Sequence, residues 1–194
     1  MLLNAVNLEG RFVRLVPVAH THRDDLRSMF ATDPDNWLLQ SVSALGEHFD
    51  SYWRMMTETP RRITLVAFDK ATGCMAGTSS MFDIDPVHRT LEIGYTWFRP
   101  ECRGTMINPE TKLLMLKEAF GAGARRVQFS VSAANQRSQA AVLKLGAKKE
   151  GILRNHKITW TGYERDTVLF SIIDDEWADV RSRLISRLEE LSIA

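Results

Sequence analysis

The sequence has little of what would mark a secreted, membrane-spanning or disulfide-stabilised protein. Its two cysteines, Cys74 and Cys102, are too few for a disulfide scaffold and are typical of a reducing compartment. No run of about 18 apolar residues is present, so no membrane-spanning helix is expected. The opening MLLNAVNLEGR lacks the basic and apolar regions of a signal peptide. We therefore expect a cytoplasmic protein with no membrane partner.

An excess of charge of one sign is also missing. Lys and Arg together number 25 and Asp and Glu 24, which leaves a formal net charge of +1. A nucleic-acid-binding protein usually presents a basic face, so nucleic acid is not an expected partner. The five histidines lack the spacing of a zinc site, so no metal is expected.

What the sequence does contain is the composition of one folded domain. Of its 194 residues, 44% are hydrophobic and 25% are charged, which is ordinary for a globular protein. A chain of this size buries roughly 70% of the surface that it exposes when unfolded. No linker, repeat or low-complexity tract divides it, so we expect a single domain over residues 1–194.

Hydrophobic periodicity predicts a mixture of strands and helices. Three apolar segments joined by short turns predict an antiparallel meander, and strands alternate with helices in the second half of the chain. The expected fold class is therefore mixed α/β or α+β, built around one sheet. The expected strands cover residues 11–16, 63–68, 74–82, 91–98, 127–131, 150–159 and 163–172. The expected helices are one that ends near residue 33 and four over residues 44–57, 108–120, 135–145 and 174–191.

Two segments and a closing stretch carry a resemblance to a known family. They are EIGYTWFRPECRGTMINPETKLLMLKEAF, SVSAANQRSQAAVLKLGAKKEGILRNH and GYERDTVLFSIIDDEW. Their order and spacing resemble the GNAT superfamily of N-acetyltransferases, and within it the RimJ/RimL branch that acetylates the N termini of ribosomal proteins. The similarity covers nearly the whole chain.

The resemblance implies a fold and a reaction. The sheet would be mostly antiparallel, with helices on both faces, and splayed between its fourth and fifth strands, residues 91–98 and 127–131. Acetyl-CoA would be the co-substrate, with its pantetheine arm in the gap, and a primary amine would be the acceptor. Relatives commonly form symmetric homodimers, which the sequence itself does not decide.

The loop at residues 103–108 is the expected diphosphate site. It precedes the helix start Asn108-Pro109-Glu110, with Asn108 as the expected cap, and a helix N terminus offers free N–H groups and a positive dipole end. In the family the loop runs Gln/Arg-x-x-Gly-x-Gly/Ala; Arg103 matches, whereas Met106 and Asn108 replace small residues. Taken alone, the loop favours an ordinary capped helix after a turn, and only the flanking segments of the resemblance favour the diphosphate site. The resemblance assigns cofactor binding to Trp97, Phe98, Arg99, Arg103, Gly104, Thr105, Met106, Ile107, Asn108, Asn135 and Ser138.

The resemblance also suggests which residues carry the chemistry. Asn135 and Ser138 match the Asn-x-x-Ser helix start whose asparagine contacts the pantetheine arm; simple helix capping is the alternative. Many relatives protonate the thiolate with a tyrosine at a position that is Val142 here, so Ser138 is the expected substitute, unless it is an ordinary first-turn serine.

Glu92 is the expected acceptor of the proton of the amine, directly or through water. The alternative is a place in a cross-strand pair. The predicted function is acetyl transfer by direct attack of the amine, without a covalent enzyme intermediate. A CoA-binding module with weak or no catalysis is the alternative, because Met106, Asn108 and Val142 depart from the family pattern.

Overall fold

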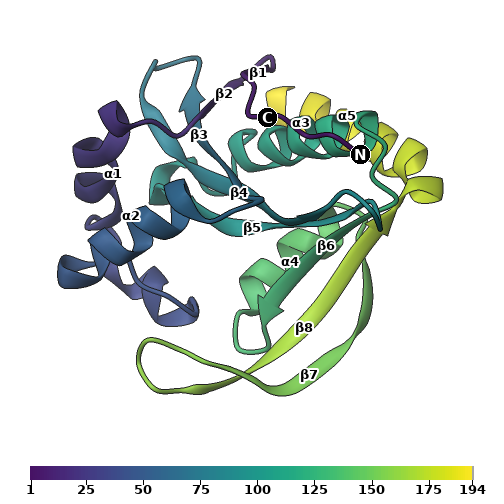
Figure 1. Cartoon of the computed structure of the whole chain (residues 1–194). Coiled ribbons are helices and arrows are strands. Elements are labelled where there is room, and N and C mark those ends of the chain that lie inside the picture. Colours follow the sequence, from purple (N-terminus) through teal and green to yellow (C-terminus); the bar gives the residue numbers. More distant parts are fainter. Residues whose placement is uncertain (194) are drawn as a thin grey trace.

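The computed structural model describes residues 1–193, which build one eight-stranded sheet with helices on both faces (Figure 1). The strand order is β1-β2-β3-β4-β5-β6-β8-β7. Every neighbouring pair is antiparallel except β5 and β6, which run parallel. The strands are β1 (Leu8–Glu9), β2 (Val13–Pro17), β3 (Ile63–Asp69), β4 (Met75–Asp85), β5 (Thr90–Phe98), β6 (Arg126–Ser132), β7 (Lys148–Ile158) and β8 (Glu164–Ile173).

Five α-helices connect or follow these strands within residues 1–193. They are α1 (Arg23–Phe30), α2 (Phe49–Glu58), α3 (Ile107–Gly121), α4 (Gln136–Lys144) and α5 (Trp177–Ile193). Short 3-10 segments occupy His20–His22, Pro34–Leu39, Gly46–His48, Pro100–Cys102 and Asp174–Glu176. None of the helices in this part of the chain is both long enough and apolar enough to cross a membrane.

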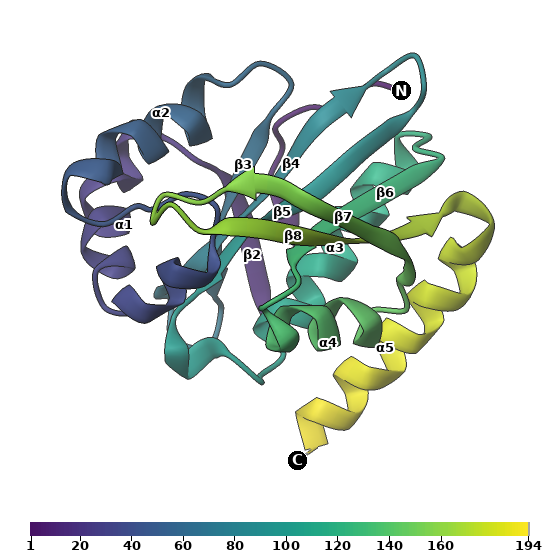
Figure 2. The same cartoon turned by 90° about the horizontal axis from the view of Figure 1, so that it is seen from below.

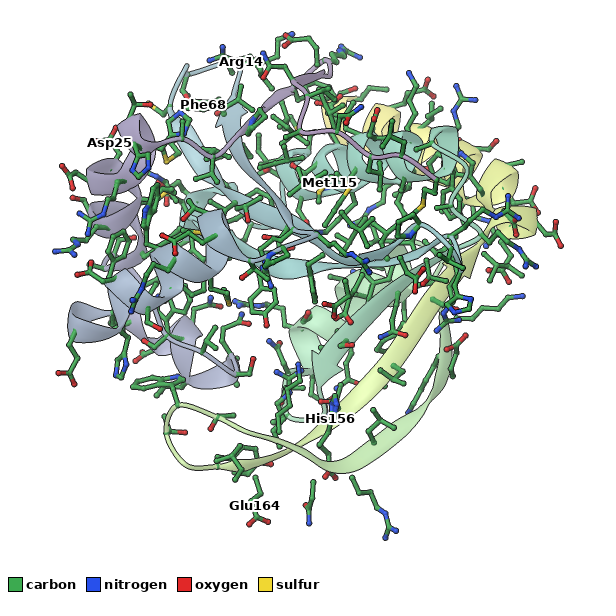
Figure 3. The ribbon with its side chains drawn as sticks, viewed as in Figure 1. Arg14, Asp25, Phe68, Met115, His156 and Glu164 are labelled. Atoms are coloured by element: carbon green, nitrogen blue, oxygen red, sulfur yellow. The ribbon has the colours of Figure 1, made fainter. Side chains whose placement is uncertain are left out.

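Two hydrophobic cores lie on the two faces of the sheet. Successive side chains of a strand point to opposite faces, and on β3 this sends Leu65 into one core and Val66 into the other. The larger core holds buried residues of α3, α4 and α5, including Met115 (Figure 3). The smaller core holds residues of α1 and α2. Figure 2 shows α1 and α2 grouped together, apart from α4 and α5.

The fold class predicted from the sequence is confirmed, and several element ends are not. α3 begins at Ile107 with Met106 as its N-cap residue, so the expectation that Asn108 caps this helix is wrong. The strand predicted over residues 11–16 begins at Val13, and β1 was not predicted at all. The start of β2 lies where a side chain from a distant part of the chain holds the backbone.

That side chain is Glu110, in the first turn of α3. Its carboxylate accepts backbone N–H groups from Arg11 (2.8 Å), Phe12 (2.7 Å) and Val13 (2.6 Å). Glu110 is buried, and a buried carboxylate is stabilised when several N–H groups donate to it. The carboxylate therefore joins the turn before β2 to the helix that begins beside the predicted diphosphate loop.

We expect Glu110→Gln to lower the free energy of unfolding by about 2–3 kcal/mol. The amide presents one oxygen to three donors and places an NH₂ group against backbone N–H groups. Urea denaturation measures the loss. Glu190→Gln is the matched control, because Glu190 is exposed on α5, and an equal effect of the two substitutions would contradict this role of Glu110.

Candidate functional site

The central feature of the site is the separation of β5 from β6. The two strands are paired at Thr90↔Arg126, Leu91↔Val127 and Glu92↔Gln128. After these three pairs, residues 93–98 of β5 and residues 129–132 of β6 line the same pocket, with a volume of about 250 Å³. The pocket therefore lies between the two strands that the sequence identified as its walls.

A bulge in β5 accompanies this separation. The register between β4 and β5 shifts between Thr78↔Trp97 and Ser80↔Gly94, which gives β5 one extra residue. Tyr95 lies in the bulge with φ +48°, in the left-handed region that non-glycine residues rarely adopt. Bulges bend a strand and redirect its side chains, and Tyr95 itself lines the pocket.

The structure brings some of the predicted site residues together in this pocket and leaves others outside it. Glu92, Arg99, Thr105, Met106 and Ile107 are not among its lining residues. Those that line it are Trp97, Phe98, Arg103, Gly104, Asn108, Asn135 and Ser138.

The loop at residues 103–108 reaches the pocket through Gly104 and Asn108. Gly104 has φ +79°, so this is the position that needs a glycine. Met106 has φ −67°, which any residue adopts, so the departure at Met106 leaves the backbone path intact. The side chain of Arg103 donates from Nε to the carbonyl oxygen of Phe98 (2.9 Å) and forms an ion pair with Asp33. Arg103 therefore anchors the loop to the rest of the protein.

Three polar atoms of the pocket wall are buried without a partner in the described chain. They are Nε1 of Trp97, Oδ1 of Asn108 and Nε of Arg165. Buried polar atoms without a partner are rare and costly, and a bound ligand is one way to satisfy them. Because Asn108 does not cap α3, its side chain is free for this contact. A polar, elongated ligand such as CoA fits these donors and acceptors.

The N terminus of α4 forms another wall. Oδ1 of Asn135 accepts the backbone N–H of Ser138 (3.0 Å), so the capping interpretation of Asn135 is correct. The amide NH₂ of Asn135 is left over for another contact. Within residues 1–193, the Oγ of Ser138 has no hydrogen bond, and Ser138 and Val142 both line the pocket. A free hydroxyl and an apolar side chain therefore face the pocket from α4.

Glu92 lies at the last paired position, where the strands begin to separate. Its Oε2 accepts a hydrogen bond from Nε2 of Gln128 (3.0 Å), the residue opposite it in the register. Glu92 thus has the cross-strand partner that was the structural alternative, while its other oxygen is free to bind a water.

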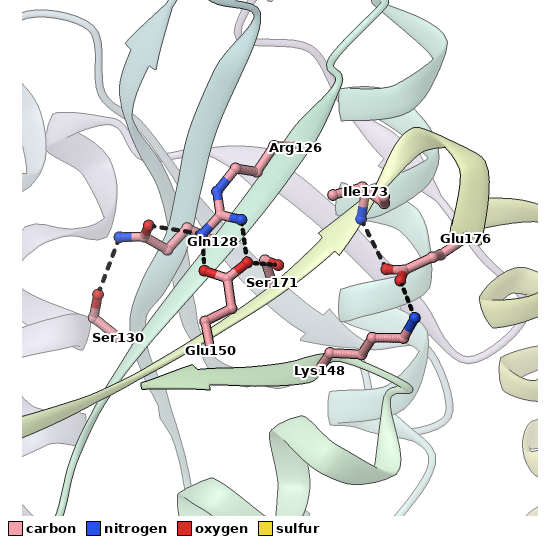
Figure 4. Close-up of polar contacts among 8 residues, drawn as sticks. All are labelled: Arg126, Gln128, Ser130, Lys148, Glu150, Ser171, Ile173 and Glu176. Atoms are coloured by element: carbon pink, nitrogen blue, oxygen red, sulfur yellow. Dashed lines mark hydrogen bonds and ion pairs between the residues drawn. The ribbon is translucent and has the colours of Figure 1, made fainter. Parts of the chain in front are cut away.

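A second carboxylate on this part of the sheet is already engaged (Figure 4). Glu150 forms a bidentate ion pair with Arg126 and accepts a hydrogen bond from the hydroxyl of Ser171 (2.7 Å). The guanidinium of Arg126 and the Ser171 hydroxyl hold the pKa of Glu150 down to about 2 despite its partial burial. A carboxylate with so low a pKa is a poor base, so Glu150 does not compete with Glu92 for the role of proton acceptor.

Lys112 is a pocket residue that the sequence analysis missed. Its ammonium group is buried and donates to Oγ of Ser79 (2.8 Å) and Oγ1 of Thr96 (2.6 Å), and these hydroxyls are 2.8 Å apart. No carboxylate in residues 1–193 pairs with it. Burial lowers the pKa of Lys112 to about 7. Nothing in the local pattern of α3 signals this, because the two hydroxyls come from β4 and β5.

Within the described residues, no group of three or more His, Cys, Asp or Glu side chains is arranged to hold a metal ion. Cys102, which flanks the loop, is half-buried, and burial raises the pKa of its thiol.

Comparison with known proteins agrees with this geometry. Residues 13–148 match the family described as "Acetyltransferase (GNAT) domain". A solved structure from T. thermophilus, described as a "putative acetyltransferase", is 33% identical, with a TM-score of 0.88 over 97% of this chain and 100% of that one. The structure of RimJ from Mycobacterium smegmatis in complex with CoA-disulfide has 20% identity and a TM-score of 0.77, over 90% of this chain and 88% of that one, and shows a shared fold.

A curated relative matches part of the chain. "Putative ribosomal N-acetyltransferase YdaF" of Bacillus subtilis (strain 168) is 29% identical over 106 residues, or 54% of this chain. The match spans 57% of the length of that relative.

We expect Lys112→Met to stabilise the ligand-free protein at neutral pH. In the wild type, the folded state holds a proton on Lys112 only below about pH 7, whereas the unfolded lysine titrates near 10.5. Between these values the unfolded state binds more protons, so wild-type stability rises with pH. The advantage of the Met variant is then up to about 5 kcal/mol below pH 7 and falls as the pH approaches 10.

Chemical denaturation of both proteins across this pH range measures the difference. Lys117→Met is the control on the same helix, because Lys117 is exposed. An advantage of Lys112→Met that does not change with pH would contradict a buried, titrating ammonium group.

Proposed function

The chain belongs to the GNAT acetyltransferase family, and from this premise we propose that it transfers the acetyl group of acetyl-CoA to a primary amine, either a protein N terminus or a small molecule. The observation that carries the proposal is the pocket between β5 and β6, which is bordered by the beginnings of both α3 and α4. The whole chain, residues 1–194, would act as one catalytic domain.

Several groups of the pocket would hold acetyl-CoA. The backbone N–H groups at the start of α3 and around Gly104 suit the diphosphate. The unpaired edges of β5 and β6 suit the amide groups of the pantetheine arm, as in the addition of a strand to a sheet. The free NH₂ group of Asn135, Nε1 of Trp97 and Oδ1 of Asn108 offer further hydrogen bonds. When bound, the co-substrate supplies a thioester whose acyl carbon is open to attack by an amine.

The residues of the chain then have separate roles. Glu92 is not a pocket-lining residue, so it would take the proton of the incoming amine through a water molecule. Ser138 would donate a hydrogen bond to the departing sulfur from its free hydroxyl. Backbone N–H groups of β5 beyond Glu92 would polarise the carbonyl of the thioester.

The identity of the acceptor is proposed from a relative and not from the pocket itself. The name of the B. subtilis relative directs the first assays toward ribosomal proteins. A CoA-binding module with weak catalysis is the second candidate, and Val142 favours it, because this side chain lines the pocket without a proton to donate.

We expect the purified protein to release free CoA thiol from acetyl-CoA when an amine acceptor is present. Peptide N termini, amino acids and amines without carboxylates form the panel, and a thiol-reactive dye measures the rate against hydrolysis alone. Tight calorimetric binding of CoA without transfer to any acceptor would select the second candidate, and absence of CoA binding would exclude both.

We expect Ser138→Ala to lower kcat by about tenfold, because one hydrogen bond to the departing sulfur is lost in the transition state. The Kd of CoA should change by less than about twofold, since the substitution leaves the backbone N–H of residue 138 in place. Ser182→Ala, on the exposed side of α5, is the control. An unchanged kcat would assign Ser138 a purely structural role.

A further inference from the structure

Arg165 is a buried arginine that lines the pocket. It belongs to β8, outside the loop at residues 103–108 and the start of α4, which are assigned to the co-substrate. The residue is only 6% exposed. Burial lowers the pKa of its guanidinium, yet an arginine side chain keeps its charge in proteins. The pocket wall therefore contains a permanent positive charge.

This charge has no partner within residues 1–193. Nε of Arg165 is buried without a hydrogen bond, and no ion pair of the described chain includes the residue. Neither nearby acid forms an ion pair with it: Glu92 accepts from Gln128 through one oxygen, and Asp166 accepts the backbone N–H of Asn155 (2.7 Å). A buried charge without a partner is costly, so a ligand that supplies an anion would be strongly favoured.

The position of Arg165 places it on the side of the pocket that the β7–β8 hairpin forms. The hairpin is tied to the segment between α1 and α2 through Trp160, whose Nε1 donates to the carbonyl oxygen of Trp37 (2.9 Å) and whose N–H donates to that of Ser41 (3.2 Å). Figure 3 shows His156 on the inner side of this hairpin and Glu164 on its outer side. Arg165 thus belongs to a wall different from the one that α3 and α4 form.

The surroundings of Arg165 contain charges of both signs. The carboxylate of Glu92 acts to raise the pKa of the Arg165 guanidinium, against the larger effect of burial. Lys157 lies opposite Arg165 in the register, and burial together with the charges of Lys157 and Arg165 lowers the pKa of His156. A polyamine would meet repulsion here, whereas a carboxylate would meet a planar fork of donors.

We propose that Arg165 recognises a carboxylate on the acceptor, so that the preferred substrates are amines that carry a carboxylate close to the reacting nitrogen. The proposal rests on the acetyl transfer proposed above and names its substrate class. Two sources supply this chemistry: the α-carboxylate of a free amino acid, and an acidic side chain next to a peptide N terminus.

Matched pairs of acceptors test the preference. Alanine is compared with alanine amide, and an Ala-Asp peptide amide with the Ala-Asn peptide amide; spermidine represents the polyamines. We expect at least one carboxylate to raise kcat/KM about 10- to 100-fold over its amide, as is usual for a charge-assisted contact. The pair that shows the preference identifies the source of the carboxylate.

Variants of Arg165 test the residue. Arg165→Gln should bring this ratio close to one through a higher KM, and Arg165→Lys should retain part of it, because the charge remains and the planar fork is lost. The Kd of CoA should stay within about twofold in both. Arg154→Gln, which removes an exposed charge from the same hairpin, should leave the ratio unchanged. Circular dichroism verifies that each variant is folded.

A binding measurement separates this inference from the proposed transfer. Calorimetry with N-acetylalanine and its amide, and with the N-acetylated Ala-Asp and Ala-Asn peptide amides, in the presence of CoA, reports the same preference without turnover for both sources of the carboxylate. If the protein transfers no acetyl group but binds the carboxylate ligand more tightly than the amide, only the proposed transfer is overturned. Equal affinity for acid and amide, or a preference that survives in Arg165→Gln, overturns the role of Arg165. A CoA Kd about tenfold weaker in Arg165→Gln, with acceptor preference unchanged, assigns the residue to the co-substrate instead.

Discussion

The site depends on the parallel pair β5 and β6, whose hydrogen-bonded pairing ends before either strand does. β5 and β6 share three pairs and then separate, while both continue for several residues. Backbone groups along such a gap lack the partners that the rest of the sheet has, and burying them without partners is unfavourable. Because the strands are parallel, both lead toward the same end of the sheet, and α3 and α4 both begin there. The fold thereby assembles a gap, two helix N termini and a hydroxyl in one place.

The sequence predicted the parts of this arrangement that local patterns encode. Alternation in β6 and the apolar stripe of α3 are local, and they were recognised with errors of a few residues at the ends. The bulge at Tyr95 was not, because a positive φ in a tyrosine has no compositional signal. Lys112 was missed for a related reason: its partners Ser79 and Thr96 lie on other elements, so its burial is a property of the assembled sheet.

The departures from the family pattern differ in their consequences. Met106 adopts φ −67°, and the positive φ falls at Gly104, so the side chain of Met106 imposes no strain on the backbone of the loop. Val142 changes the chemistry, because no rearrangement of the backbone gives valine a proton to donate. The free hydroxyl of Ser138, one turn earlier on α4, lies in the same pocket. Val142 therefore affects the proposed reaction more than Met106 does. The family residue expected at position 142 acts through its side chain, whereas the glycine expected at position 106 contributes only its backbone conformation.

Lys112 and Arg165 are the two buried basic side chains of the pocket, and they differ in whether they can lose their charge. Lys112 can lose its proton near pH 7, so an unliganded protein need not bury its charge. Its two hydroxyl partners satisfy the nitrogen in either state, since a hydroxyl both donates and accepts. Arg165 has neither option: it keeps its charge, and no partner in residues 1–193 satisfies Nε. A fold that retains such a residue in its pocket is less stable without an anion there than with one, and the difference is available as binding energy to a ligand that brings a carboxylate.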